Sequence, residues 1–304
     1  MNVLVTGALG FIGSHVCREL LRSGHAVTGI DVASYAADPS RILDLDIDVR
    51  IADICDEEKV CDIIDQKKID WIVNTAAETH VDNSIKSASS FIHSNVDGTR
   101  SILESCKRTG AKLLHFSTDE VYGVPDLEPF TEESPLKPRN PYSATKAAAD
   151  HLVYAYAVTH GLRSITIRPS NNFGVGQHGE KFIPTVIRSI RSGGKVPVYG
   201  DGMQEREWTS VKDTARAVSF LLKNPEDRMG QVYNLSSGFS LHNIEVLRSI
   251  VEILRPGDNY LDHVQRVQDR PGHDKKYWIS SSKIENEGFR FTESFEDTLR
   301  EVCS

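Results

Sequence analysis

A glycine-rich turn close to the N-terminus constrains the fold of this chain more than any other feature. Residues 7–13 read Gly-Ala-Leu-Gly-Phe-Ile-Gly; they follow the apolar run Val3 to Thr6 and lead into the amphipathic segment Ile12 to Ser23. A strand, a tight glycine turn and a helix in this order let the backbone approach a pyrophosphate and place it at a helix N-terminus. The residues expected at a dinucleotide are therefore Gly7, Gly10, Phe11, Ile12 and Gly13.

An acidic residue at the end of the next apolar run indicates which dinucleotide this would be. Asp31 closes the run that begins at Ala26, eighteen residues after Gly13. A carboxylate at that point accepts hydrogen bonds from the adenosine ribose and repels a 2′-phosphate. We therefore predict NAD rather than NADP. The alternative is a purely structural turn with a helix-capping aspartate nearby.

The pattern that follows predicts an α/β fold. Short apolar runs alternate with longer amphipathic segments, which is typical of βαβ units and a parallel sheet. Strands are expected at Val3–Thr6, Ala26–Asp31, Val49–Ala52, Trp71–Thr75, Leu113–Ser117 and Ser164–Arg168. Helices are expected at Ile12–Ser23, Glu57–Lys67, Ser89–Thr109 and Tyr142–His160, with isolated ones at Ile183–Ser192, Asp213–Asn224 and Asn243–Leu254.

These elements predict two parts of unequal size. Residues 1–170 would form a Rossmann-type, doubly wound parallel sheet domain that binds NAD. The run Val232 to Leu235 resembles a further core strand, so we expect the chain to return to this sheet near 231–236. Most of 171–304 would form a smaller, C-terminal substrate-binding lobe.

Composition excludes several classes of protein. The 304 residues include 35 Lys and Arg against 43 Asp and Glu, a formal charge of −8, and no basic block, which argues against nucleic acid as a partner. No stretch reaches the roughly 18 apolar residues of a membrane span, and the start lacks a secretory signal, so we expect a cytoplasmic protein without membrane contact. Five cysteines without a Cys-x-x-Cys pair argue against a disulfide framework or a zinc cluster, and we expect no metal.

Tyr142 and Lys146 are candidates for general base chemistry. They are four residues apart on a predicted helix, so both side chains project from one face. The ammonium and an oxidised nicotinamide would both favour phenolate, so we expect the pKa of Tyr142 to be lowered. The same spacing is common on surface helices, and the pair alone is therefore weak support for catalysis.

Two adjacent acids at the end of the fifth predicted strand are candidates for an acid/base pair. Residues 117–120 read Ser-Thr-Asp-Glu, so the hydroxyl of Thr118 is followed by the carboxyl groups of Asp119 and Glu120. Adjacent acids in loops are most often solvated. At the carboxyl end of a sheet strand, different surroundings can separate their pKa values and leave one protonated and the other ionised.

These segments together resemble a known family. Ser117-Thr-Asp-Glu-Val-Tyr-Gly123, Ala76-Ala-Glu-Thr-His-Val-Asp-Asn-Ser-Ile85 and Tyr142-Ser-Ala-Thr-Lys146 are similar to the nucleotide-sugar 4,6-dehydratases of the extended short-chain dehydrogenase/reductase family, above all those acting on dTDP-glucose. Further similar segments lie at 170–174, 180–184, 200–208 and 269–274, so the resemblance covers nearly the whole chain. Sugar epimerases share the glycine turn and the Tyr/Lys pair, but typically lack the Asp-Glu couple.

The resemblance implies a reaction and a role for each catalytic residue. Tyr142 would take the proton of the sugar 4-hydroxyl, with Thr118 bonded to the same oxygen and Lys146 keeping the phenol acidic. Glu120 would remove the proton on carbon 5, and protonated Asp119 would donate to the departing 6-hydroxyl. NAD would accept hydride from carbon 4 and return it to carbon 6.

Binding residues and assembly follow from the same resemblance. Asp53 and Ile54 would flank the adenine, and Ala76 and Ala77 would line the dinucleotide. The residues expected at a nucleotide-diphosphate hexose are Asn171, Glu180, Lys181, Phe182, Arg206, Asn243, Arg270 and His273, with the two arginines as phosphate donors. His80 and Asp82 would lie near the nicotinamide without an assigned role. The family's habit predicts a homodimer through the helices 89–109 and 142–160.

Some alternatives stay open on the sequence. A nucleotide-sugar 4-epimerase would use Tyr142 and Lys146 but not the two acids, and a non-catalytic NAD-binding regulator would use none of them. Arg206, between two glutamates, could instead form a surface ion pair. The short segment after Asp31 and the short C-terminus leave open whether the base is thymine or uracil.

Overall fold

A seven-stranded parallel sheet forms the centre of the molecule. The computed structural model describes residues 1–269 and 274–304. The strands of the sheet are β1 (Asn2–Thr6), β2 (Ala26–Asp31), β3 (Asp48–Ile51), β4 (Trp71–Asn74), β5 (Lys112–Phe116), β6 (Ser164–Pro169) and β10 (Val232–Leu235). They lie in the order β3-β2-β1-β4-β5-β6-β10, and all neighbours are parallel. The doubly wound sheet and its returning strand are thus confirmed, and each predicted sheet strand lies within one residue of its expected bounds.

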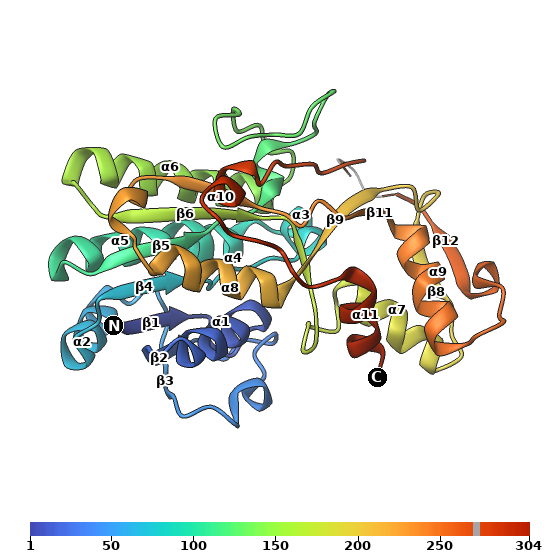
Figure 1. Cartoon of the computed structure of the whole chain (residues 1–304), viewed down its shortest axis with the longest axis horizontal. Coiled ribbons are helices and arrows are strands. Elements are labelled where there is room, and N and C mark those ends of the chain that lie inside the picture. Colours follow the sequence, from blue (N-terminus) through green and yellow to red (C-terminus); the bar gives the residue numbers. More distant parts are fainter. Residues whose placement is uncertain (270–273) are drawn as a thin grey trace.

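Helices cover both faces of this sheet (Figure 1). On one face lie α1 (Phe11–Arg22) and α8 (Val211–Leu222), whose apolar residues share a core with Val5 and Val73. On the other face lie α2 (Glu57–Lys67), α5 (Gly98–Thr109) and α6 (Pro141–His160), packed on Leu4 and Ile72. Neighbouring residues of a strand point to opposite faces, so a sheet covered on both sides requires continuous apolar runs such as those of β1 and β4.

The segment expected as a single helix over 89–109 is interrupted. It consists of α4 (Ser89–Phe91), a π-helical segment over Ile92–Asp97, and α5. A further helix, α3 (Val81–Lys86), precedes it and was not expected from the sequence. π-Turns within helices are frequent at functional sites, and this one lies beside the cofactor cleft described below.

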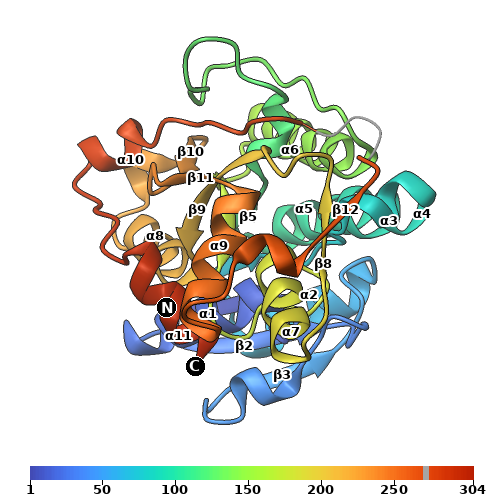
Figure 2. The same cartoon turned by 90° about the vertical axis from the view of Figure 1, so that its right-hand side faces the viewer.

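The C-terminal residues form a second, smaller core (Figure 2). It contains the three-stranded sheet β11 (Ser240–His242), β9 (Glu205–Ser210), β7 (Asn171–Phe173) and the two-stranded sheet β8 (Val196–Tyr199), β12 (Val264–Val267). Its helices are α7 (Phe182–Arg191), α9 (Asn243–Leu254) and α11 (Phe295–Cys303), which pack around Phe173 and Trp208. In the sequence between α9 and α11, α10 (Ser282–Asn286) packs beside β10, so the last part of the chain also contacts the large sheet (Figure 2).

Within the described ranges, none of the helices has the length and apolarity that a membrane crossing requires. All five cysteines are free; four are buried, and Cys55 is partly accessible.

Candidate active site

A cleft of about 430 Å³ opens at the carboxyl ends of the strands of the large sheet. The strand order reverses between β1 and β4, and the connections that leave these two strands in opposite directions create a crevice there. The cleft is lined by every residue expected at the dinucleotide: Gly7, Gly10, Phe11, Ile12, Gly13, Asp31, Asp53, Ile54, Ala76, Ala77, Tyr142 and Lys146. It is also lined by Thr118, Asp119 and Glu120, so the structure brings the predicted cofactor and catalytic residues together.

The glycine turn is packed so closely that side chains would not fit. Gly7 has φ +67°, a left-handed conformation that favours glycine. A Cβ on Gly13 would lie only 2.1 Å from the carbonyl oxygen of Gly7. The turn therefore brings the first amides of α1 to the floor of the cleft without side chains in between, as a pyrophosphate site requires.

Asp31 is held rigidly at the edge of the cleft. One carboxylate oxygen accepts the backbone N–H of Leu9 at 2.9 Å, and the other accepts that of Ala33 at 2.8 Å. The side chain is buried, yet it lines the cleft. A fixed negative charge at this point fits ribose hydroxyls and disfavours a phosphate on the ribose.

One guanidinium joins the segments around the mouth of the cleft. Arg41 donates to the carbonyl oxygens of Leu9 at 2.7 Å and Ala36 at 3.0 Å, and to that of Gly176 at 2.8 Å. These three acceptors lie in the glycine turn, in the connection after β2 and in the C-terminal half of the chain. We call this set of bonds the Arg41 clasp.

The structure corrects the expected pKa of Tyr142. Burial raises this pKa, and the negative charge of Glu120 raises it further, while a hydrogen bond with Thr118 lowers it. Lys146 is buried too, which lowers its own pKa to about 8, and its Nζ donates to the carbonyl oxygen of Phe116 at 2.5 Å. Burial and Glu120 therefore shift the pKa of Tyr142 against the direction expected from Lys146, and a positive nicotinamide beside the phenol would shift it in the opposite direction.

Asp119 and Glu120 differ in their surroundings as the acid/base hypothesis requires. Asp119 is 3% exposed, and burial, with Glu120 and Glu207 nearby, raises its pKa well above the usual range of a carboxyl group. Thr118 donates to its Oδ1 at 3.1 Å, whereas its buried Oδ2 has no hydrogen-bond partner among the described residues. The raised pKa of Asp119 is in the direction that a proton donor requires, and this side chain lines the cleft.

Two residues that the sequence analysis missed hold Glu120. Asn140 Nδ2 donates to Glu120 Oε2 at 3.0 Å. The single hydroxyl proton of Tyr277 is shared between the same oxygen at 3.2 Å and Asp274 Oδ2 at 2.9 Å. These contacts fix the orientation of the Glu120 carboxyl group. Asn140 followed by Pro141 is a helix-start signal directly before Tyr142, so it could have been found; Tyr277 lies 157 positions from Glu120 and gave no signal.

Comparison with known proteins assigns the family. The model of the NAD dependent epimerase/dehydratase family matches residues 3–236. The chain belongs to this family. Low-salt glycan biosynthesis protein Agl12 of Haloferax volcanii is 43% identical, over 100% of this chain and 97% of the relative. The dTDP-glucose 4,6-dehydratase of Haemophilus influenzae is 39% identical, over 99% of this chain and 96% of the relative.

A solved relative in the epimerase/dehydratase family has the same fold over its whole length. The crystal structure of DesIV, a dTDP-glucose 4,6-dehydratase from Streptomyces venezuelae with NAD and TYD bound, superposes with a TM-score of 0.95 at 37% identity. The match covers 100% of this chain and 96% of that one. The resemblance seen in the sequence and the prediction of NAD as cofactor are thus confirmed at the level of the family. The glycine turn and Asp31 give NAD a site that fits it.

The residues expected at the substrate are only partly in the cleft. Asn171, Glu180 and Lys181 line it. Phe182 instead packs near Trp208 at the start of α7, and the backbone N–H of Asn243 bonds to Gln204 at the start of α9. Arg270 and His273 lie outside the described residues.

Arg206 is neither a cleft-lining residue nor the surface ion pair considered as an alternative. It is buried, and its guanidinium lies over the ring of Tyr277 at 4.2 Å. Its Nη atoms donate to the carbonyl oxygens of Glu205 and Asp274. In this arrangement Arg206 supports Tyr277, and a role at the substrate phosphates stays a prediction.

The two residues near the expected nicotinamide remain without a catalytic role. His80 accepts the backbone N–H of Asn83 as the cap of α3, and Asp82 accepts the hydroxyl of Tyr199 at 3.0 Å. Asp82 thus joins α3 to β8 of the smaller lobe.

Proposed function

We propose that this chain catalyses the 4,6-dehydration of a nucleotide-diphosphate hexose, dTDP-glucose in the first place and UDP-glucose in the second, to the 4-keto-6-deoxy sugar. The observation that carries the proposal is that Asp119, which is buried and has a raised pKa, lies next to Glu120, held by Asn140, in the same cleft as Tyr142. Oxidation at carbon 4 alone needs one base. Elimination of water needs a base and an acid in addition, and this cleft provides both.

The residues around Tyr142 serve the oxidation step. NAD held by the glycine turn and Asp31 would supply the acceptor for hydride from carbon 4, the donor of hydride to carbon 6, and a positive charge in the cleft. Tyr142 accepts the proton of the 4-hydroxyl, and Thr118 bonds to the same sugar oxygen. Lys146, whose pKa lies near 8, supplies a positive charge one helical turn from the phenol. A ketone at carbon 4 makes the proton on carbon 5 acidic.

The two acids serve the elimination step. Glu120 removes the proton from carbon 5, and Asp119 gives its proton to the oxygen on carbon 6. The carbon–oxygen bond breaks, water leaves, and a double bond forms between carbons 5 and 6. The proton on Glu120 exchanges with solvent, and Glu120 then protonates carbon 5 as hydride is returned to carbon 6. The sugar has lost one water, and no net oxidation has occurred.

The relatives support this choice of substrate. Two of those described above are named as dTDP-glucose 4,6-dehydratases, and one of them was solved with NAD and TYD bound. The Haloferax relative is named for glycan biosynthesis, which fits an enzyme that prepares a sugar for transfer.

A panel of nucleotide sugars tests the proposal. The full-length protein is incubated with dTDP-glucose, UDP-glucose and their galactose counterparts, and products are identified by mass spectrometry and NMR. We expect a product 18 mass units lighter than the substrate when the reaction is run in H2O, and one deuteron at carbon 5 of the product when it is run in D2O. A 4-epimer that keeps its oxygen at carbon 6 would assign the chain to the epimerases instead. Binding of NAD without turnover of any of these sugars would instead favour a non-catalytic NAD-binding regulator.

We also infer a homodimer through α5 and α6, in the cytoplasm. Tyr154 and Val158 are 70% and 66% exposed and lie one helical turn apart on α6, so they leave an apolar strip beside α5. Large apolar side chains grouped on one face are typical of a contact surface.

A further inference from the structure

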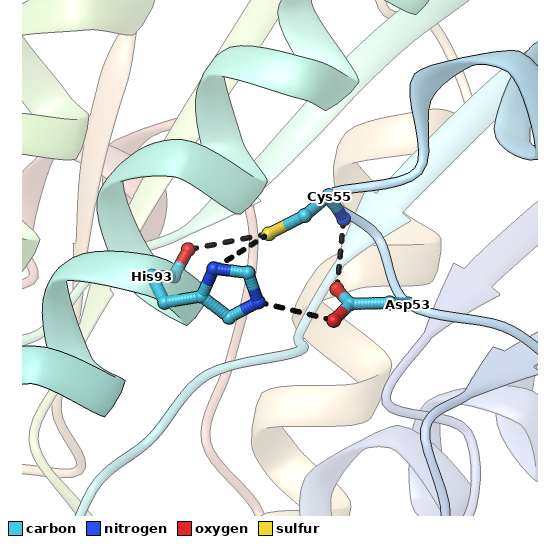
Figure 3. A group of neighbouring side chains, drawn as sticks. All are labelled: Asp53, Cys55 and His93. Carbon is cyan, nitrogen blue, oxygen red and sulfur yellow. Dashed lines mark hydrogen bonds and ion pairs between the residues drawn. The ribbon is translucent and has the colours of Figure 1, made fainter.

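Three side chains with metal-binding atoms meet at one end of the cofactor cleft (Figure 3). Asp53 and Cys55 follow β3, and His93 belongs to the π-helical segment Ile92–Asp97. His93 Nε2 lies 3.1 Å from Asp53 Oδ2, and Cys55 Sγ lies 3.7 Å from His93 Nδ1. One ligand atom of each residue can be chosen so that all three lie within 4.8 Å of one another.

We propose that Asp53, Cys55 and His93 form a binding site for a divalent ion of the zinc class, and that this ion competes with the dinucleotide. Thiolate, imidazole and carboxylate are the three protein ligands that zinc uses, and three of them with a water complete a tetrahedron. With zinc bonds of about 2.0–2.3 Å, ligand atoms in a tetrahedron lie ~3.3–3.8 Å apart. One nitrogen of His93 lies near Asp53 and the other near Cys55, and one ligand atom of each residue lies within 4.8 Å of the other two. His93 is exposed, and a turn of its ring brings a single nitrogen closer to both of the other ligands.

The local backbone already orients two of the ligands. The backbone N–H of Cys55 donates to Asp53 Oδ1 at 2.8 Å, which leaves Oδ2 facing His93. The thiol of Cys55 donates to the carbonyl oxygen of His93 at 3.3 Å, which holds the sulfur beside the imidazole. Burial and the negative charge of Asp53 raise the pKa of Cys55 to about 12, so the thiol keeps its proton until a metal displaces it.

Competition with the cofactor follows from shared residues. Asp53 and His93 line the dinucleotide cleft together with Ala52 and Ile54, whereas Cys55 does not line it. An ion held at this position takes the carboxylate oxygen of Asp53 and draws His93 toward the cleft wall. Because binding free energies are reciprocal, NAD must weaken metal binding by the same factor by which the metal weakens NAD binding.

Cobalt and zinc titrations of the full-length protein, freed of bound dinucleotide, test the site. We expect one equivalent of Co²⁺ to produce a sulfur-to-cobalt charge-transfer absorption band, and Zn²⁺ to abolish it. Calorimetry in buffers of different ionisation enthalpy should show proton release on zinc binding. Absence of the charge-transfer band in the wild-type protein would overturn the proposal.

Variants locate the ion and separate loss of a ligand from loss of the fold. Cys55→Ser should abolish the band while NAD affinity stays within twofold, which also shows that the protein is folded. His93→Ala should weaken zinc binding at least ~10-fold. Removal of a residue that only supports a metal ligand already weakens binding by about this factor, so removal of a ligand should have at least the same effect. His151→Ala, which removes an exposed histidine on α6, should have no effect. Equal zinc affinity in the wild type and His93→Ala would place the ion elsewhere, and equal zinc affinity with and without saturating NAD would refute the competition.

Discussion

Replacing Glu120 with Gln separates the two halves of the proposed reaction. Glu120 Oε2 accepts hydrogen bonds from Asn140 and Tyr277, and an amide oxygen can accept both. The Gln side chain therefore occupies the same place but cannot take up a proton. Because the charge of Glu120 raises the pKa of Tyr142, its removal makes the phenol easier to deprotonate. Oxidation at carbon 4 should consequently be no slower than in the wild type.

Elimination, by contrast, loses its base. A positioned general base typically contributes ~10²–10⁴-fold to a rate. This corresponds to about 3–5 kcal/mol in the barrier for proton removal from carbon 5. We expect the rate of formation of the 4-keto-6-deoxy sugar to fall by this factor, and KM to change little.

The assay follows the sugar at both steps. Quenching with borodeuteride labels carbon 4 of any keto sugar, and mass spectrometry shows whether oxygen is still present at carbon 6. In Glu120→Gln the labelled sugar should retain that oxygen and its original hydrogen at carbon 5. Glu128→Gln, an exposed control, should behave as the wild type. A dehydration rate in Glu120→Gln within twofold of the wild type would refute the assigned roles.

Four further predictions follow from the structure. Gly13→Ala should weaken NAD binding ~10–100-fold, measured by calorimetry, because the added Cβ meets the carbonyl oxygen of Gly7 and such overpacking costs about 1–3 kcal/mol. The control Gly194→Ala should leave NAD affinity unchanged, because a Cβ at Gly194 makes ordinary contacts at 3.5 Å. Tyr277→Phe should lower kcat ~5–10-fold at constant KM, the effect of one lost hydrogen bond to the proposed base, and an unchanged kcat would remove its positioning role. Burial raises the pKa of Glu207 to about 7, so the folded form binds the proton more tightly and the free energy of unfolding falls as pH rises from about 4.5 to 7. Glu207→Gln should reduce this fall by at most about 3 kcal/mol, measured by urea titrations at pH 5 and pH 8. An identical pH dependence in the wild type and the variant would contradict the raised pKa of Glu207. Tyr154→Glu should shift the sedimentation coefficient from dimer to monomer if the exposed strip of α6 is the contact, whereas an unchanged dimer would place the contact elsewhere.

The large sheet could be predicted from the sequence because its strands are buried on both faces. Val3–Val5 and Trp71–Val73 are apolar without interruption and fully buried. The strands of the smaller lobe could not be found in this way. β9 reads Glu-Arg-Glu-Trp-Thr-Ser, and its buried polar residues are satisfied by partners distant in the sequence. The π-helical segment was equally invisible, because its residues are compatible with an ordinary helix.

The residues of the candidate site also fall into those that the sequence could place and those that only the tertiary structure could place. Groups next to a strand end, such as Asp31 and Asp119, could be placed because the fold brings all strand ends to one edge. Tyr277 could not, because only the tertiary packing of the C-terminal segment carries its hydroxyl to Glu120. The sign of the pKa shift of Tyr142 also depends on tertiary structure, since the spacing to Lys146 says nothing about how much water the phenol loses.

The Arg41 clasp bears on the timing of cofactor exchange. Its three carbonyl acceptors belong to segments that contribute residues to the cleft wall, and we expect the bonds to Leu9, Ala36 and Gly176 to oppose separation of these segments as a dinucleotide leaves. Exchange is then governed by the frequency of that opening and not by equilibrium affinity alone. In the proposed reaction each turnover restores the NAD that it used, so a slow exit costs the enzyme nothing in throughput. The dinucleotide would behave as a long-lived part of the protein, retained through purification and over many catalytic cycles.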